Sequence, residues 1–327
     1  MRFSSTGLVV DGPNPAHPAH PWLAFADAVL RGIGQVMLQN NSYAGLVFLL
    51  GMAYSAPLLG LAMLVGTVAS TGTALWLNLE RSALRAGWFG FNGALVAAAL
   101  LHFFQGGVWL WVCVLGAAAA TTLLMAALLR LLAAWQLPAL TAPFVLVTLC
   151  LVLASERWGL LHATQHLAPA GRLPESAGLA QGGVGLGTVA EGVLNGVAQV
   201  FFQGNVLAGG VFTLGLLLSS RVAAAGALLG SLAGLLVGWG LGAAEPALRA
   251  GAHGFSPALT AVALCTLAPA LNTCTVVFAL GAALATALVQ AALSAVFGPL
   301  GLPVLTLGFV LVTWASLWAL AQCRRRS

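Results

Sequence analysis

The sequence has no lysine and very few charged residues of any kind. Of its 327 residues only 6% are charged, whereas 60% are hydrophobic and 40 are glycine. A soluble domain carries roughly a quarter charged residues, so this chain cannot cover a globule with a hydrated surface. The composition excludes a water-soluble enzyme. It predicts an all-α polytopic membrane protein with room for about ten crossings of roughly 20 apolar residues each.

All 12 basic residues are arginine, set against 7 acidic residues. They are scattered over expected loops and form no basic face, so we expect no nucleic-acid partner. The exception is the cluster Arg324, Arg325 and Arg326 at the end of the chain. Under the positive-inside rule this cluster, together with an even number of crossings, predicts that both termini are cytoplasmic.

Residues that carry cofactor or metal chemistry are also scarce. The cysteines are odd in number and lie mostly within apolar runs, and the histidines show no spacing typical of metal ligands. No protease, esterase or nucleotide-binding motif is present, so we expect no enzyme activity, no cofactor and no metal. Residues 1–21 form a polar, proline-rich segment without the apolar core of a signal peptide.

An internal repeat organises the rest of the chain. Three blocks recur in the same order, two at a spacing of 164 residues (as from Gln35 to Gln199) and the third at 165. The blocks are Gly32–Asn41 with Gly196–Asn205, Gly90–Leu95 with Gly254–Leu259, and Leu137–Phe144 with Leu302–Phe309. The chain therefore divides into two homologous halves, 22–168 and 169–327, with a linker at about 163–187.

Each half is predicted to hold about five transmembrane helices and one re-entrant pore helix, which begins near Phe91 or Phe255. An odd number of crossings per half gives an inverted repeat, and such proteins bind their substrate between the repeats. The first half is predicted to span near residues 30–54, 58–77, 108–132 and 141–153. The first of these stretches is long enough to split at Asn40–Asn41.

Polar side chains recur at matched positions within the apolar stretches. Gln35 and Gln39 share one helix face, and Gln199 and Gln203 repeat them. Amides inside a membrane are costly unless they are hydrogen-bonded, so they either join helices or line a polar path. Their recurrence in both halves favours two ends of one channel for Gln35 and Gln199.

Two further pairs repeat. Thr141 and Thr306 each lie three residues after a proline, where a hydroxyl adjoins freed backbone carbonyls, although a bond back to the same helix is the alternative. Phe91 and Phe255 open the two short segments, followed one turn later by Leu95 and Leu259. Either these side chains belong to the core, or they form matched walls of a flat slot.

A pair of acidic residues also recurs, Asp27 and Glu191. Asp27 lies four residues before Arg31, which favours a local ion pair. Asn195 stands in the place of that arginine in the second half, so the sequence leaves Glu191 open as a proton site.

The repeated Gly-x-Gly-Gln-Val block, the Trp88–Asn92 block and above all Leu137–Phe144 resemble the urea transporter family, and most closely its bacterial members. The resemblance runs from about Asp27 to Thr313. It implies a homotrimer in a bacterial inner membrane, with a pore in each protomer that passes urea by facilitated diffusion through a selectivity filter.

The resemblance also implies which residues contact urea. One site uses Gln35, Phe91 and Leu95, and the other uses Gln199, Phe202, Phe255 and Leu259. Thr141 and Thr306 flank the narrow middle of the pore. Leu38 stands three residues after Gln35, where Phe202 follows Gln199.

Other functions stay open from the sequence. A pore for another small neutral solute, such as a urea analogue, a short amide, ammonia or water, needs the same kinds of residue. A proton-coupled secondary transporter needs Glu191. The uncharged filter candidates favour passive transport, because an ion entering an apolar slot loses its hydration without compensation.

Overall fold

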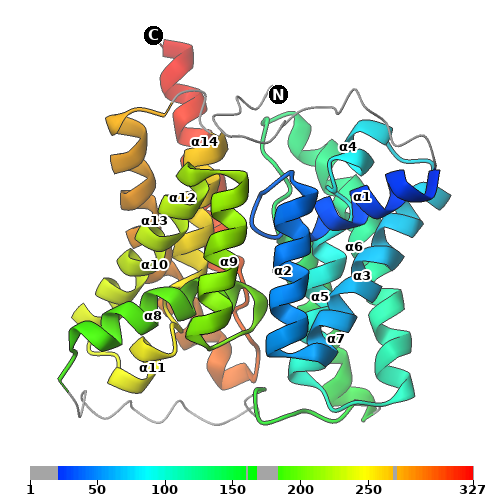
Figure 1. The fold of residues 1–327 in the computed structure, drawn as a ribbon, viewed down its shortest axis with the longest axis horizontal. Helices are drawn as coiled ribbons and strands as arrows, with labels where there is room; N and C mark the ends of the chain where they lie inside the picture. Colours follow the sequence, from blue (N-terminus) through cyan, green and yellow to red (C-terminus); the bar gives the residue numbers. More distant parts are fainter. Residues whose placement is uncertain (1–20, 160, 168–182, 268–270, 327) are drawn as a thin grey trace. The chain divides into compact units, whose positions relative to one another are not determined.

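The structure is a computed structural model that describes residues 21–159, 161–167, 183–267 and 271–326 (Figure 1). The polar N-terminal segment, apart from its last residue, and the middle of the predicted linker lie outside these residues. The described residues are mainly α-helical, and the β-type pairing among them is one isolated bridge between Phe104 and Ala163. The predicted all-α class is confirmed.

The helices follow one another in two similar series. The first series is α1 (Pro21–Gln35), α2 (Ser42–Ser55), α3 (Pro57–Trp76), α4 (Arg81–Arg85), α5 (Phe91–Phe103), α6 (Val108–Ala133) and α7 (Ala142–Trp158). The second is α8 (Leu186–Ala198) with the 3-10 turn η1 (Gln199–Phe201), α9 (Val206–Ser219), α10 (Arg221–Gly240), α11 (Glu245–Arg249), α12 (Phe255–Leu267), α13 (Thr273–Phe297) with η2 (Gly298–Leu300), and α14 (Leu307–Arg326).

Helix lengths repeat along with helix order. The helices α2 and α9 have 14 residues each, α3 and α10 have 20, α4 and α11 have 5, and α5 and α12 have 13. These four pairs of equal length occur in the same order in the two series, as an internal repeat predicts.

Backbone turns repeat as well. Among the described residues, all but one of those with positive φ form pairs at the repeat spacing. The pairs are Leu38 and Phe202, Asn78 and Gly242, Gly87 and Gly251, Gln136 and Gly301, and Leu140 and Leu305. The exception is Gly159. Because the left-handed region is costly for residues other than glycine, such pairs indicate turns that both halves require.

The long apolar stretch predicted near residues 30–54 is not one helix. Helix α1 ends at Gln35 and α2 begins at Ser42, so the alternative split at Asn40–Asn41 is correct. Asn41 caps α2, because its Oδ1 accepts hydrogen bonds from the backbone N–H groups of Tyr43 (2.9 Å) and Ala44 (3.3 Å). The other three predicted stretches agree with α3, α6 and α7 to within a few residues.

Among the described residues, four helices are long and apolar enough to cross a membrane: α3, α10, α6, and α13 with its 3-10 extension. The segments Leu186–Phe201 and Val206–Ser219 are long and apolar enough only when combined, and the angle between them is 74°. They make a fifth span only if this bent pair is one span. Shorter apolar helices include α5 and α12. These spans confirm a multi-pass membrane protein. The figure of about ten crossings stays a prediction.

The long helices turn large apolar side chains outward. On α6, Val112 is 51% exposed and Leu123 is 55% exposed, and on α13 Leu288 is 51% exposed. Threonines on the same helices, such as Thr122 and Thr286, are fully buried. Helices surrounded by lipid are expected to turn apolar side chains outward and polar side chains toward the protein interior.

The chain forms two compact units. Unit 1 consists of Met1–Leu128, Pro143–Leu167 and Leu214–Arg221, and unit 2 of Leu129–Ala142, Ala168–Thr213 and Val222–Ser327. In Figure 1, α1 of unit 1 runs across the direction of α2 with the short helix α4 beside it, and α8 of unit 2 lies beside α11. Each unit thus includes a short segment from the other half of the sequence.

Candidate functional site

In unit 1, a close crossing of glycines brings the end of α1, which carries Gln35, near the start of α5, which carries Phe91. Gln35 is the last residue of α1, and Phe91 is the first residue of α5. A methyl group added to Gly32 would lie 3.1 Å from the Cα of Gly90, so the two backbones nearly touch. Gly32 precedes Gln35 by three residues and Gly90 immediately precedes Phe91, so this crossing sets the positions of both side chains.

Unit 2 repeats the crossing. A methyl group added to Gly196 would lie 3.0 Å from the Cα of Gly254. Gln199 follows Gly196 by three residues, and Phe255 follows Gly254 directly. Gln199 and Phe255 are half-buried, as is Gln35.

The two glutamine amides have the same partner in their respective units. Gln35 Nε2 donates to the backbone carbonyl of Ala86 at 2.8 Å, and Gln199 Nε2 donates to that of Ala250 at 3.1 Å. Ala86 and Ala250 cap the C-termini of α4 and α11. Because a carbonyl accepts only from the NH₂ end of an amide, this contact leaves each Oε1 as the free acceptor end.

Just beyond these glutamines, α1 and the α8–η1 segment end in the same type of turn. In the first, the N–H of Leu38 donates to Gln35 O (2.9 Å); in the second, the N–H of Phe202 donates to Gln199 O (3.0 Å). Leu38 and Phe202 have φ of 61° and 58°, at a position where glycine is usual. Left-handed geometry costs a bulky residue roughly 1–2 kcal/mol, and such strain gathers at functional sites.

The second glutamine of each pair has a local role. Gln39 Nε2 donates to Met37 O at 2.8 Å, and Gln203 Nε2 donates to Phe201 O at 3.4 Å. Both side chains are buried. They therefore stabilise the turns that follow Gln35 and Gln199.

Thr141 and Thr306 meet directly within unit 2. Their hydroxyl oxygens lie 2.7 Å apart, and both side chains are buried. The preceding residues, Leu140 and Leu305, have φ of 51° and 53°. The turn that holds Thr141 is tied down by Trp314, whose Nε1 donates to Pro138 O at 2.8 Å.

Phe91, Leu95 and Leu259 are buried, and Leu95 and Leu259 follow their phenylalanines by one turn of α5 and α12. The candidate residues fall into two groups. Unit 1 holds Gln35, Phe91 and Leu95, and unit 2 holds Gln199, Phe202, Phe255, Leu259, Thr141 and Thr306.

Comparison with known proteins identifies the family. A family model described as "Urea transporter" matches residues 26–321. The chain is 33% identical to the urea transporter 1 proteins of goat and sheep, and 31% identical to that of mouse, over 294 residues. Each alignment covers 89% of this chain and 76% of the relative.

The chain belongs to the urea transporter family. Members of this family are channels and not enzymes, so the resemblance seen in the sequence and the absence of an enzymatic role are both confirmed.

Glu191, the residue that the sequence left open as a proton site, is paired in this family member. Arg249 Nη1 donates to Glu191 at 2.9 Å, and the same guanidinium contacts Glu245 at 2.8 Å. In unit 1 the matching residue Asp27 pairs with Arg31 at 2.7 Å, as the sequence predicted. Glu191 is therefore part of a charged cluster with Arg249 and Glu245.

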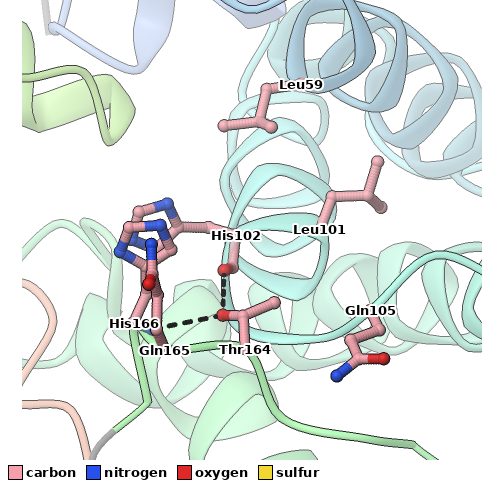
Figure 2. Close-up of a pocket in the computed structure, with 7 residues that line it drawn as sticks. All are labelled: Leu59, Leu101, His102, Gln105, Thr164, Gln165 and His166. Atoms are coloured by element: carbon pink, nitrogen blue, oxygen red, sulfur yellow. Dashed lines mark hydrogen bonds between the residues drawn. The ribbon is translucent and has the colours of Figure 1, made fainter.

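A pocket of about 440 Å³ lies in unit 1 at the C-terminal end of α5 (Figure 2). His102 stacks on His166 there, with ring centroids 4.2 Å apart, and the backbone carbonyl of His102 accepts from the Thr164 hydroxyl. None of the predicted filter residues lines this pocket. Among the described residues, no group of three His, Cys, Asp or Glu is placed to hold a metal ion.

Sequence reasoning missed two features of the site. The carbonyls of Ala86 and Ala250 carry no side-chain signal, because any residue provides them. The second missed feature is the left-handed conformation of Leu38, for which the only signal was its repeat spacing from Phe202. The repeat therefore identified a partner that residue type alone concealed.

Proposed function

We propose that the protein passes urea down its concentration gradient through a slot formed by the candidate residues. The observation that carries this proposal is the matched pair of glutamines, each fixed with its acceptor oxygen free. Urea is planar and neutral with four N–H donors and one carbonyl acceptor, so it needs acceptors along its edge when it leaves water.

The apolar residues complete the slot. Phe91 with Leu95, and Phe255 with Leu259, would supply flat apolar walls that suit a thin planar solute. A neutral solute gives up only a few hydrogen bonds to water on entering, whereas transfer of an unpaired ion from water costs far more free energy. Acceptors placed in series, including the Thr141 and Thr306 hydroxyls, would replace those bonds one after another without holding the solute tightly.

The ion pair between Glu191 and Arg249 favours passive transport over proton coupling. Channel-type transport also suits a site whose candidate residues are all uncharged. A pore for another small neutral solute is the second candidate, because the same acceptors and walls would admit a short amide or a urea analogue.

The wider assembly is also part of the proposal. By its resemblance to the family, we expect a homotrimer with one pore per protomer, an inverted arrangement of the two halves and a bacterial inner-membrane location. The terminal arginine cluster favours cytoplasmic termini. Cross-linking in native membranes tests the trimer, and labelling of tags at the two ends tests their side.

The test of function is stopped-flow efflux of urea from proteoliposomes that contain the purified protein. We expect urea flux well above that of empty liposomes, unchanged by a pH gradient, with slower flux of N-methylated ureas. If another neutral solute passes and urea does not, that solute would replace urea as the proposed substrate. Urea accumulation driven by a proton gradient would overturn passive transport.

A further inference from the structure

Two short helices occur at matched positions, and the filter proposal gives them no role. The five-residue helices α4 and α11 each end close to a filter glutamine. Both end in the same hydrogen-bonded turn. Gly87 N–H donates to Leu84 O and Trp88 N–H to Ala83 O, and Gly251 and Ala252 donate in the same way to Leu248 and Ala247. This pair of backbone hydrogen bonds defines a Schellman motif, with glycine at the left-handed position.

The motif leaves the last carbonyls of each helix without a partner inside the turn. In a Schellman turn the carbonyls of C3 and C2 are occupied, whereas that of the capping residue is not. The capping residues are Ala86 and Ala250, and their carbonyls are the ones that accept from Gln35 and Gln199. Each half-buried amide thus finds its partner in a backbone oxygen that the turn itself does not use.

Gly87 and Gly251 are required for this contact on two counts. Their φ values are 76° and 74°, which disfavour a side chain. A methyl group on Gly87 would also lie 2.4 Å from the backbone nitrogen of Gly32, and one on Gly251 would lie 2.2 Å from that of Gly196. Those atoms belong to α1 and α8, one turn before the glutamines. Any side chain would push the short helix away from the helix that carries the filter amide.

We propose that the α4 and α11 turns position the filter, with Gly87 and Gly251 as the residues that determine the orientation of the Gln35 and Gln199 amides. The capping carbonyl holds Nε2, so that Oε1 faces the permeating solute. If the turn moves away, the amide is free to rotate and presents donor or acceptor at random. This inference rests on the proposed role of the glutamines and adds the element that orients them.

The chain offers matched controls for a glycine substitution. Gly159 and Gly242 also have positive φ, 62° and 83°, but a methyl group on either would meet nothing within 4 Å. Replacement by alanine at these positions imposes the same backbone cost without displacing a helix.

The experiment compares urea efflux from proteoliposomes for G87A, G251A, G159A and G242A. We expect G87A and G251A to lower the flux about tenfold, corresponding to loss of one oriented hydrogen bond. We expect the two controls to stay within about twofold of wild type, since they alter only local backbone conformation. Wild-type flux in folded G87A and G251A would overturn the inference, whereas absence of flux in the wild type would overturn the proposed function.

A double variant separates positioning from general damage. In the Q35L background the amide is already gone, so G87A should reduce flux no further. If the losses multiply instead, Gly87 acts on the fold and not through Gln35, and the inference fails. The pair G251A with Q199L gives the same test in unit 2.

Should the glycine variants not fold, hydrogen–deuterium exchange tests the contact directly. Q35L should raise backbone exchange in residues 81–88 and leave 245–252 unchanged, and Q199L should do the reverse. Equal exchange in wild type and both variants would show that the amides do not hold these turns, and would overturn the inference.

Discussion

In the first half an asparagine on the short helix joins three elements, whereas in the second half a glutamine on the long helix does so. Asn92 of α5 accepts from the N–H of Phe144 at 3.1 Å and donates to the sulfur of Met125 at 3.8 Å. Gln290 of α13, at the repeat position of Met125, has its own set of bonds. Its partners are Ser256 Oγ (3.3 Å), Leu305 O (2.9 Å) and Gly308 N (3.2 Å).

The glutamines of the proposed filter, by contrast, keep residue type, position and partner in both halves. The difference teaches that each half needs one amide to join the short helix, the long helix and the start of the last helix, whichever helix carries it. The two glutamine positions are under tighter geometric control, because the same side chain meets the matching backbone carbonyl in each half.

The largest effect on stability is expected when the joining amide is removed. Asn92→Ser would leave the buried N–H of Phe144 without its acceptor, which should cost roughly 1–3 kcal/mol. Thermal unfolding of the purified protein measures this loss. Adding Met125→Gln should restore much of the lost stability, because residues 92 and 125 would then be Ser and Gln, as are Ser256 and Gln290 in the second half. If the double variant is no more stable than Asn92→Ser alone, the amide on the long helix does not substitute for the amide on the short helix.

A second prediction uses a position where the halves differ in a turn. Gln136 has φ of 55° and is exposed, whereas its repeat partner Gly301 has φ of 68°. Gln136→Gly should raise the free energy of unfolding by up to about 1 kcal/mol, because glycine relieves the left-handed strain. Chemical denaturation measures the gain, and urea flux should not change. A clear loss of stability would contradict the assignment of strain.

The charged clusters of the two units differ in a way that pH can reveal. Hydrogen bonds from Thr188 and Arg249 lower the pKa of Glu245 below its ordinary value of 4.5. A lowered pKa contributes stability above the ordinary value, and this contribution is lost as pH falls through the pKa of the folded state. Thr188→Ala should therefore slightly destabilise the protein at pH 7 but not under strongly acidic conditions. Melting curves across this range would contradict the prediction if the deficit grew in acid.

The smallest effect is expected at the histidine pair. The second half has Thr266 where the first has His102. The backbone carbonyl of His102, which accepts from Thr164, survives any substitution. His102→Thr should leave urea flux and melting temperature almost unchanged. A large loss of flux in stopped-flow measurements would mean that the pocket in Figure 2 takes part in transport.

Much of this account could be predicted from the sequence because the chain repeats itself. Composition indicated a membrane protein, and the recurrence of Gln35 as Gln199 and of Thr141 as Thr306 singled out polar residues that a lone pattern would have left ambiguous. The contact between Thr141 and Thr306 joins residues far apart in the chain, so it required the structure.

Other parts of the site could not be predicted, because they depend on backbone conformation. Leucine gives no hint that Leu38, Leu140 and Leu305 adopt left-handed geometry, since propensity alone disfavours it. The partner of Glu191 was also hidden. Arg249 lies 58 residues further along the chain, beyond any local pairing rule.

We propose that Gln35 and Gln199 act as two equivalent acceptors for urea. Stopped-flow urea efflux from proteoliposomes, with Gln35→Leu, Gln199→Leu and the exposed control Gln105→Leu, tests it most directly. We expect similar losses of roughly two- to tenfold for the first two variants, as for one hydrogen bond each, and none for the control. Wild-type flux in both filter variants, with the folded protein confirmed, would contradict it.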